Sequence, residues 1–74
     1  MAYDYGKLIG RITEKYRTRA AFASAIGMSE HTLSVKLSSK IAWKQSEILR
    51  ACRLLEIPHG EIGDYFFKLE VQSA

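Results

Sequence analysis

Apolar residues recur at helical spacing along most of the chain, and each break carries a residue that starts or ends helices. The first stripe predicts a helix over about residues 5–16, with Asp4 placed to cap its start. Thr18 can cap a second, short helix, and Gly27 stands where a helix end favours a left-handed residue. The inward residues are Tyr5, Leu8, Ile9, Ile12 and Tyr16 in the first helix and Phe22, Ala23 and Ile26 in the second.

Two further helices follow from the same spacing. Ser29 is a good N-cap, and the third helix would run from it to about Leu37. A fourth helix is predicted over residues 44–55, and Pro58 ends it because the residue before a proline avoids the helical region. The same proline fits the first turn of a final helical segment that reaches toward Tyr65. The inward positions are Leu33 and Leu37 in the third helix and Ile48, Ala51, Cys52 and Leu55 in the fourth.

The apolar pattern changes to a period of two near the C-terminus. Phe67, Leu69 and Val71 alternate with polar residues, which predicts a short strand. No repeat, low-complexity tract or linker divides the 74 residues, and a chain of this length forms one small domain. The pattern therefore predicts an all-α fold over residues 1–74, a single bundle of about five short helices with a short C-terminal β-strand.

Residues 19–37 meet the physical requirements of a helix-turn-helix. Two short helices joined by a tight turn cross closely, so the first needs a small residue, here Ala23, and the turn needs a glycine, here Gly27. Ser29 then presents the free amide end of the third helix, which favours a phosphate. The third helix is therefore the candidate reader of the DNA major groove.

Charge is distributed unevenly along the chain. Residues 1–44 carry eight basic and three acidic side chains, a net +5, whereas residues 45–74 carry three basic and five acidic ones, a net −2. A basic N-terminal portion suits a face that approaches a polyanion such as DNA. The alternative is a random scatter of surface charge in a chain whose net charge is only +3.

The central part of the chain resembles the helix-turn-helix family of phage Cro and repressor proteins and the xenobiotic-response-element regulators; it reads T-R-A-A-F-A-S-A-I-G-M-S-E-H-T-L-S-V-K-L-S-S-K. The resemblance covers roughly residues 5–65 and implies a lambda-repressor-like bundle. More narrowly, small Cro-like or antirepressor proteins of Gram-positive phages are similar in the segments Y-D-Y-G-K-L-I-G-R-I, S-E-H-T-L-S-V-K-L-S-S-K and D-Y-F-F. Two positions depart from the family pattern: Arg19 replaces a phosphate-holding glutamine of many relatives, and Lys36 replaces a bulky apolar residue.

The resemblance assigns two kinds of residue to a DNA interface. Side chains on one side of the third helix would contact bases, since Glu30 can accept from cytosine N4 and Val35 can touch a thymine methyl group. Cations and a hydroxyl around that helix would contact phosphates, which position a protein without reading sequence. The base-contacting set is Ser29, Glu30, His31, Ser34 and Val35, and the phosphate-contacting set is Arg19, Lys36, Ser38, Lys40 and Lys44.

Several residues also have a plainer interpretation. Glu30 can simply oppose the helix dipole, because a carboxylate that faces DNA is electrostatically unfavourable. His31 can be a solvated surface residue, and Lys36 can face solvent. Trp43 is expected in the core or at a hinge rather than as a base-stacking platform.

The sequence offers no catalytic, cofactor or metal site. One cysteine and two distant histidines do not make a ligand cluster, and Cys52 belongs to a buried stripe. The longest apolar run, residues 65–67, is far shorter than a bilayer span, and no signal peptide is recognisable. We therefore expect a non-enzymatic protein without a membrane partner, in the reducing cytoplasm of a bacterial host.

The C-terminal tail, residues 66–74, is a second candidate interface. Its alternating pattern offers an unpaired strand edge that the same strand of a second copy can match. Such a homodimer would set two reading helices about one DNA turn, ~34 Å, apart. The interface would consist of Phe66, Phe67, Leu69 and Val71; the alternative is a tail that folds back on its own domain.

Two functions follow from these features. The first is a Cro-like transcriptional regulator of a phage or prophage, which binds double-stranded operator DNA as a dimer through the helix that starts at Ser29. The alternative is an antirepressor that keeps the helix-turn-helix fold but binds the phage repressor protein. The sequence predicts the first function, but the reading helix offers Glu30 and few basic groups, and a net charge of +3 is low for a tight DNA binder, which keeps the alternative open.

Overall fold

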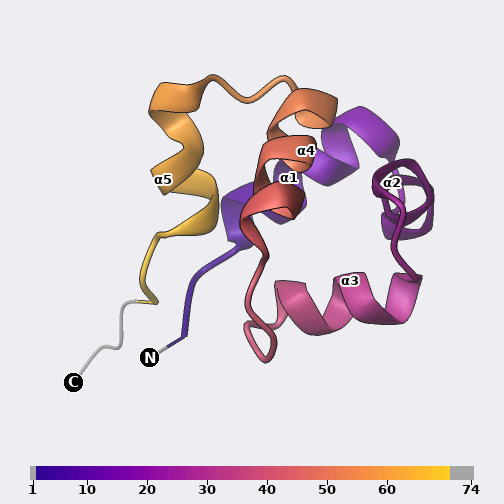
Figure 1. The fold of residues 1–74 in the computed structure, drawn as a ribbon, viewed down its shortest axis with the longest axis horizontal. Coiled ribbons are helices and arrows are strands. Elements are labelled where there is room, and N and C mark those ends of the chain that lie inside the picture. Colours follow the sequence, from indigo (N-terminus) through magenta and orange to yellow (C-terminus); the bar gives the residue numbers. More distant parts are fainter. Residues whose placement is uncertain (1, 71–74) are drawn as a thin grey trace.

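The computed structural model describes residues 2–70 and confirms an all-helical bundle. Helices α2 and α3 pack together on one side, α5 lies on the other, and α1 and α4 run between them (Figure 1). The predicted helices are confirmed to within one or two residues. Their bounds are α1 Gly6–Tyr16, α2 Arg19–Ile26, α3 Glu30–Leu37, α4 Gln45–Leu55, a 3-10 turn η1 His59–Glu61, and α5 Ile62–Phe66.

At the start of each of the four longer helices, a side-chain oxygen accepts a hydrogen bond from a backbone amide. The Asp4 carboxylate accepts from the Gly6 amide at 2.8 Å at the start of α1. The Thr18 hydroxyl accepts from Ala21 at 3.1 Å and the Ser29 hydroxyl from Thr32 at 3.0 Å, so both predicted caps are confirmed. At α4 the Glu47 carboxylate accepts from the Lys44 amide at 2.8 Å. These bonds fix where each helix begins.

Left-handed residues end α2 and α4. Gly27 has φ of +85°, and the next amide, that of Met28, donates back to the Ala23 carbonyl at 3.0 Å. Glu56 adopts φ of +55° at the end of α4, and the Ile57 amide donates to the Cys52 carbonyl at 2.8 Å. The same closing bond therefore ends both helices. Helix α4 already stops at this left-handed residue, two positions before the proline that the sequence assigned as its terminator.

One continuous core joins all five helices. The predicted stripes of α1, α2 and α4 face it, and Trp43 is buried in it, edge-on to Phe66 with ring centres 5.2 Å apart. Trp43 therefore has the core position that its plainer interpretation predicted. The fully buried large side chains are Phe22, Phe66, Leu8, Ile12, Ile26, Leu33 and Leu55.

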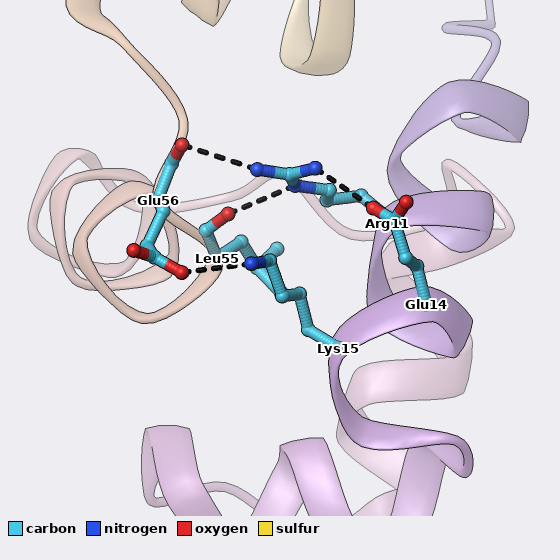
Figure 2. Close-up of polar contacts among 5 residues, drawn as sticks. All are labelled: Arg11, Glu14, Lys15, Leu55 and Glu56. Carbon is cyan, nitrogen blue, oxygen red and sulfur yellow. Dashed lines mark hydrogen bonds and ion pairs between the residues drawn. The ribbon is translucent and has the colours of Figure 1, made fainter.

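Polar contacts attach α1 to the end of α4 (Figure 2). Arg11 donates from Nε to the Leu55 carbonyl at 2.9 Å and from its terminal nitrogen to the Glu56 carbonyl at 3.3 Å. Lys15 pairs with the Glu56 carboxylate at 2.8 Å, and this hydrogen bond and charge lower the pKa of Glu56. Arg11 also pairs with Glu14 at 2.7 Å. The cations of α1 thus satisfy carbonyls at the negative end of α4.

The predicted C-terminal strand reduces to a single antiparallel bridge in the described part of the chain. Leu69 pairs with Tyr3, and the flanking bonds run from the Asp4 amide to the Lys68 carbonyl at 2.7 Å and from the Glu70 amide to the Ala2 carbonyl at 3.0 Å. Up to residue 70, therefore, the tail folds back on its own N-terminal segment rather than offering a free strand. Within residues 2–70 no helix is long and apolar enough to cross a membrane.

We predict opposite effects for the same substitution at two glycines. Gly27→Ala should lower the free energy of unfolding by about 1 kcal/mol, because alanine is strained at positive φ. Gly10→Ala should raise it by about 0.5–1 kcal/mol, because this residue lies within α1 with nothing within 4 Å of the added methyl group. Urea denaturation measures both values. Equal effects at the two sites would contradict the assigned turn geometry.

Candidate functional site

The helix-turn-helix of α2 and α3 is the first candidate surface. Ala23 is buried, as the close approach of the two helices requires, and Gly27 occupies the turn. Arg50 of α4 donates to the Ile26 carbonyl at 2.9 Å and thereby holds the end of α2 against α4. The motif is therefore rigidly attached to the rest of the domain.

The predicted base-contacting residues share one helix but differ in exposure. Ser29, Glu30 and His31 are exposed at the start of α3, whereas Ser34 and Val35 are half-buried. The Ser29 hydroxyl is already engaged, since it accepts from the Thr32 amide and donates to the Thr32 hydroxyl at 2.8 Å. Base contact by this set stays a prediction.

The predicted phosphate contacts divide into exposed and buried side chains. Arg19, Lys40 and Lys44 are exposed and form no ion pair within residues 2–70. Ser38 is exposed, and its hydroxyl donates to the Val35 carbonyl at 2.8 Å. Arg19 lies at the start of α2, Ser38 and Lys40 follow the end of α3, and Lys44 precedes α4; their phosphate contacts stay a prediction.

The prediction for Lys36 is wrong. Its side chain is only 4% exposed, and its ammonium lies 2.8 Å from a Glu47 carboxylate oxygen and donates to the Ala42 carbonyl at 3.1 Å. The aliphatic stem fills the core position that many family members give to an apolar residue, while the charge is neutralised inside the protein. Neither a phosphate contact nor a solvated surface position fits this placement.

Helix α3 therefore offers no exposed cation, because Lys36 is its only basic residue apart from His31. Its first turn carries the exposed carboxylate of Glu30. Any attraction to a phosphate backbone must come from residues outside the helix, such as Arg19 and Lys40. The electrostatics of the reading helix thus oppose tight DNA binding.

An apolar groove between α4 and α5 is the second candidate surface. We call it the α4–α5 groove; it has a volume of about 450 Å³ and is lined by Trp43, Gln45, Ile48, Leu49, Ile62 and Phe67. Leu49 is 48% exposed and Phe67 is 53% exposed, although both are large and apolar. A second hollow of about 390 Å³ adjoins the groove at Leu49 and extends along α4 to His59. Exposed apolar surface of this kind is typical of a protein-binding site.

The tail prediction identified only part of this surface. Phe67 and Leu69 are exposed, as an interface requires, but Phe66 is 1% exposed in the core and was wrongly assigned. Val71 lies outside the described residues. Leu49 and Ile62 were not among the interface residues predicted from the sequence. The sequence does contain an indication for Leu49. This leucine lies beside the apolar stripe of α4 and not within it, at a position where an amphipathic helix normally has a polar residue.

No catalytic or metal-binding arrangement occurs among the described residues. They contain no group of three His, Cys, Asp or Glu side chains that could hold a metal ion. Burial raises the pKa of the Cys52 thiol, so the thiol stays protonated and unreactive.

Comparison with known proteins places the chain in a family. The model of the family described as "Protein of unknown function (DUF739)" matches residues 1–69. The chain belongs to this family. No curated protein sequence matches it. Among solved structures, it is similar to the solution structure of the modulator of repression (MOR) of the temperate bacteriophage TP901-1 from Lactococcus lactis, with 49% identity, a TM-score of 0.80 and 97% of each chain covered.

This similarity spans α2, α3, α4 and α5 together, because it covers nearly the whole of both chains. The sequence predicted a likeness to small phage regulatory proteins, and the similarity to a phage modulator of repression confirms it. Membership in the Cro and xenobiotic-response-element family stays a prediction.

We predict that Glu47→Gln destabilises the protein most at neutral pH. The substitution leaves the buried Lys36 ammonium without its anion, which should cost roughly 2 kcal/mol, less than the loss typical of a fully buried pair, since Glu47 is 21% exposed. Burial alone would raise the pKa of Glu47, but hydrogen bonds from Lys36 and the Lys44 amide, together with both positive charges, outweigh it and lower the pKa. The stabilisation is therefore present above the usual pKa range of a carboxyl group and is lost as the pH falls through the lowered value.

Urea denaturation at neutral and acidic pH checks this expectation. The difference between wild type and Glu47→Gln should shrink toward zero in acid. The control is Glu56→Gln, which removes a carboxylate that is 72% exposed and should change stability little at either pH. A Glu47→Gln variant as stable as wild type at neutral pH would contradict the structural role of the pair.

Proposed function

We propose that this chain is a phage modulator of repression that binds the repressor protein of its own phage through the α4–α5 groove. The observation that carries the proposal is the 49% identity with the modulator of repression of TP901-1 over 97% of both chains. Similarity over that share of a small domain supports a shared role, not merely a shared motif.

Two features of the structure support a protein partner over operator DNA. The only lysine of α3 is neutralised by Glu47, so the reading helix lacks the exposed cations that dominate affinity for a phosphate backbone. The groove instead exposes Leu49 and Phe67, and aromatic and apolar side chains in a pocket are the usual energetic centre of a protein interface.

Binding measurements with both candidate partners test the proposal. Purified repressor from the same phage should bind the protein with sub-micromolar affinity in isothermal titration calorimetry. Operator DNA alone should bind weakly and without sequence preference, and adding the protein to a repressor–operator complex should release the DNA. Specific operator binding in the absence of repressor, with no repressor affinity, would refute the proposal and support the Cro-like alternative.

Surface variants locate the contact. Leu49→Ser and Phe67→Ser should each weaken repressor binding about tenfold or more, as expected at an interface centre, because each removes an exposed apolar side chain from the groove. The matched control is Ile41→Ser: Ile41 is 51% exposed but does not line the groove, so its variant should bind normally. Thermal denaturation should show that all three variants stay folded. Equal losses at Ile41 and Leu49 would contradict the assignment of the groove.

A further inference from the structure

The indole of Trp43 contains a buried hydrogen-bond donor without a partner. Trp43 is 9% exposed, and its Nε1 is the only buried side-chain nitrogen or oxygen of the described residues that makes no hydrogen bond. Its nearest aromatic neighbours are Tyr5, with ring centres 6.4 Å apart, and Phe66, at 5.2 Å. Aromatic rings are weak acceptors, so this packing does not satisfy the N–H group.

An unsatisfied buried donor destabilises a folded protein. The large indole ring offsets this by its packing in the core, but the N–H group itself contributes nothing to that packing. The same ring lines the α4–α5 groove together with Leu49 and Phe67, so it lies beside the open volume where a partner would bind. Because Nε1 is buried in the free protein, a contact with a partner requires the ring to turn until the N–H group faces the groove.

The charges next to the groove indicate the chemistry of that partner. Among the exposed charged chain neighbours of the lining residues, Lys44, Arg50 and Lys68 are basic and Glu61 is acidic, so the exposed charge beside the groove is net positive. Lys44 and Lys68 adjoin Gln45 and Phe67. Both lysines are exposed, and neither forms an ion pair within residues 2–70. A segment with acidic residues beside its apolar ones would complement them, whereas a basic segment would be repelled.

We infer that the groove binds a segment of the repressor with three features. A bulky apolar side chain fills the space between Leu49 and Phe67, a main-chain carbonyl oxygen accepts a hydrogen bond from Trp43 Nε1, and an acidic side chain faces Lys44 and Lys68. This inference rests on the proposed function. It assigns Trp43 as a specificity-determining residue, because only a segment that brings an acceptor to this point satisfies the indole.

The substitution Trp43→Phe isolates the N–H group. It keeps an aromatic ring in the core but removes the donor, so repressor affinity should fall about fivefold, the net effect typical of one hydrogen bond. The melting temperature of the free protein should change little, because removal of an unsatisfied donor offsets the packing lost with the smaller ring. The matched control is Tyr16→Phe, which removes the hydroxyl of a half-buried aromatic residue that packs on Phe22, away from the groove, and should leave affinity unchanged.

A measurement on the unmutated protein gives an independent readout. Trp43 is the only tryptophan, so a nitrogen-15 spectrum contains one indole signal. On addition of repressor this signal should move downfield, and its exchange with solvent should slow. Lys68→Glu should also weaken binding and reduce its dependence on salt, whereas Arg19→Glu, with the same change in net charge at the start of α2, should not.

The outcomes separate this inference from the proposed function. If wild type binds the repressor but Trp43→Phe binds equally well and the indole signal does not move, the inference is overturned and the proposed function stands. If wild type does not bind the repressor at all, both fail. A fivefold loss in Trp43→Phe with a shifted indole signal in wild type supports the inference.

Discussion

The ion pair between Lys36 and Glu47 determines much of the structure and of its surface chemistry. It joins the last turn of α3 to the first turn of α4, and the same two side chains bond to the Ala42 carbonyl and the Lys44 amide. The loop between the helices is therefore fixed at both sides of Trp43. Because this pair uses the one lysine of α3, the reading helix is left without an exposed cation. This one ion pair thus positions the edge of the groove and also removes a positive charge that could attract a DNA phosphate backbone to α3.

The small size of the chain explains why apolar surface remains exposed beside that groove. A domain of 74 residues buries a smaller share of its surface than a large one, and its core is already filled by residues of all five helices. Leu49 and Phe67 lie just outside this core, on opposite sides of the groove, where no further element of the described chain covers them. A partner protein can supply the missing cover, and the free energy gained by burying these side chains then contributes to binding rather than to folding.

The helices and their caps were predictable from the sequence because they depend on neighbouring residues. Thr18, Gly27 and Ser29 act through bonds to residues at most five positions away, and such signals are present in any short window. The buried position of Lys36 was not predictable in this way, since it depends on a carboxylate eleven positions later, which the loop between α3 and α4 brings near. Phe66 and Phe67 are adjacent and alike, and only the phase of a five-residue helix decides that one is core and the other is surface.

The candidate site was less predictable than the fold for the same reason. Leu49 and Phe67 are far apart in sequence and become one surface only when α4 and α5 pack against the same core. The helix-turn-helix, by contrast, is contiguous in sequence and so dominated the functional interpretation, although a fold alone does not fix a function. The structure retains the geometry of that motif while neutralising its only lysine and exposing apolar side chains elsewhere. Fold geometry and surface chemistry depend on different residues, so the same two-helix geometry is compatible with a protein partner as well as with DNA.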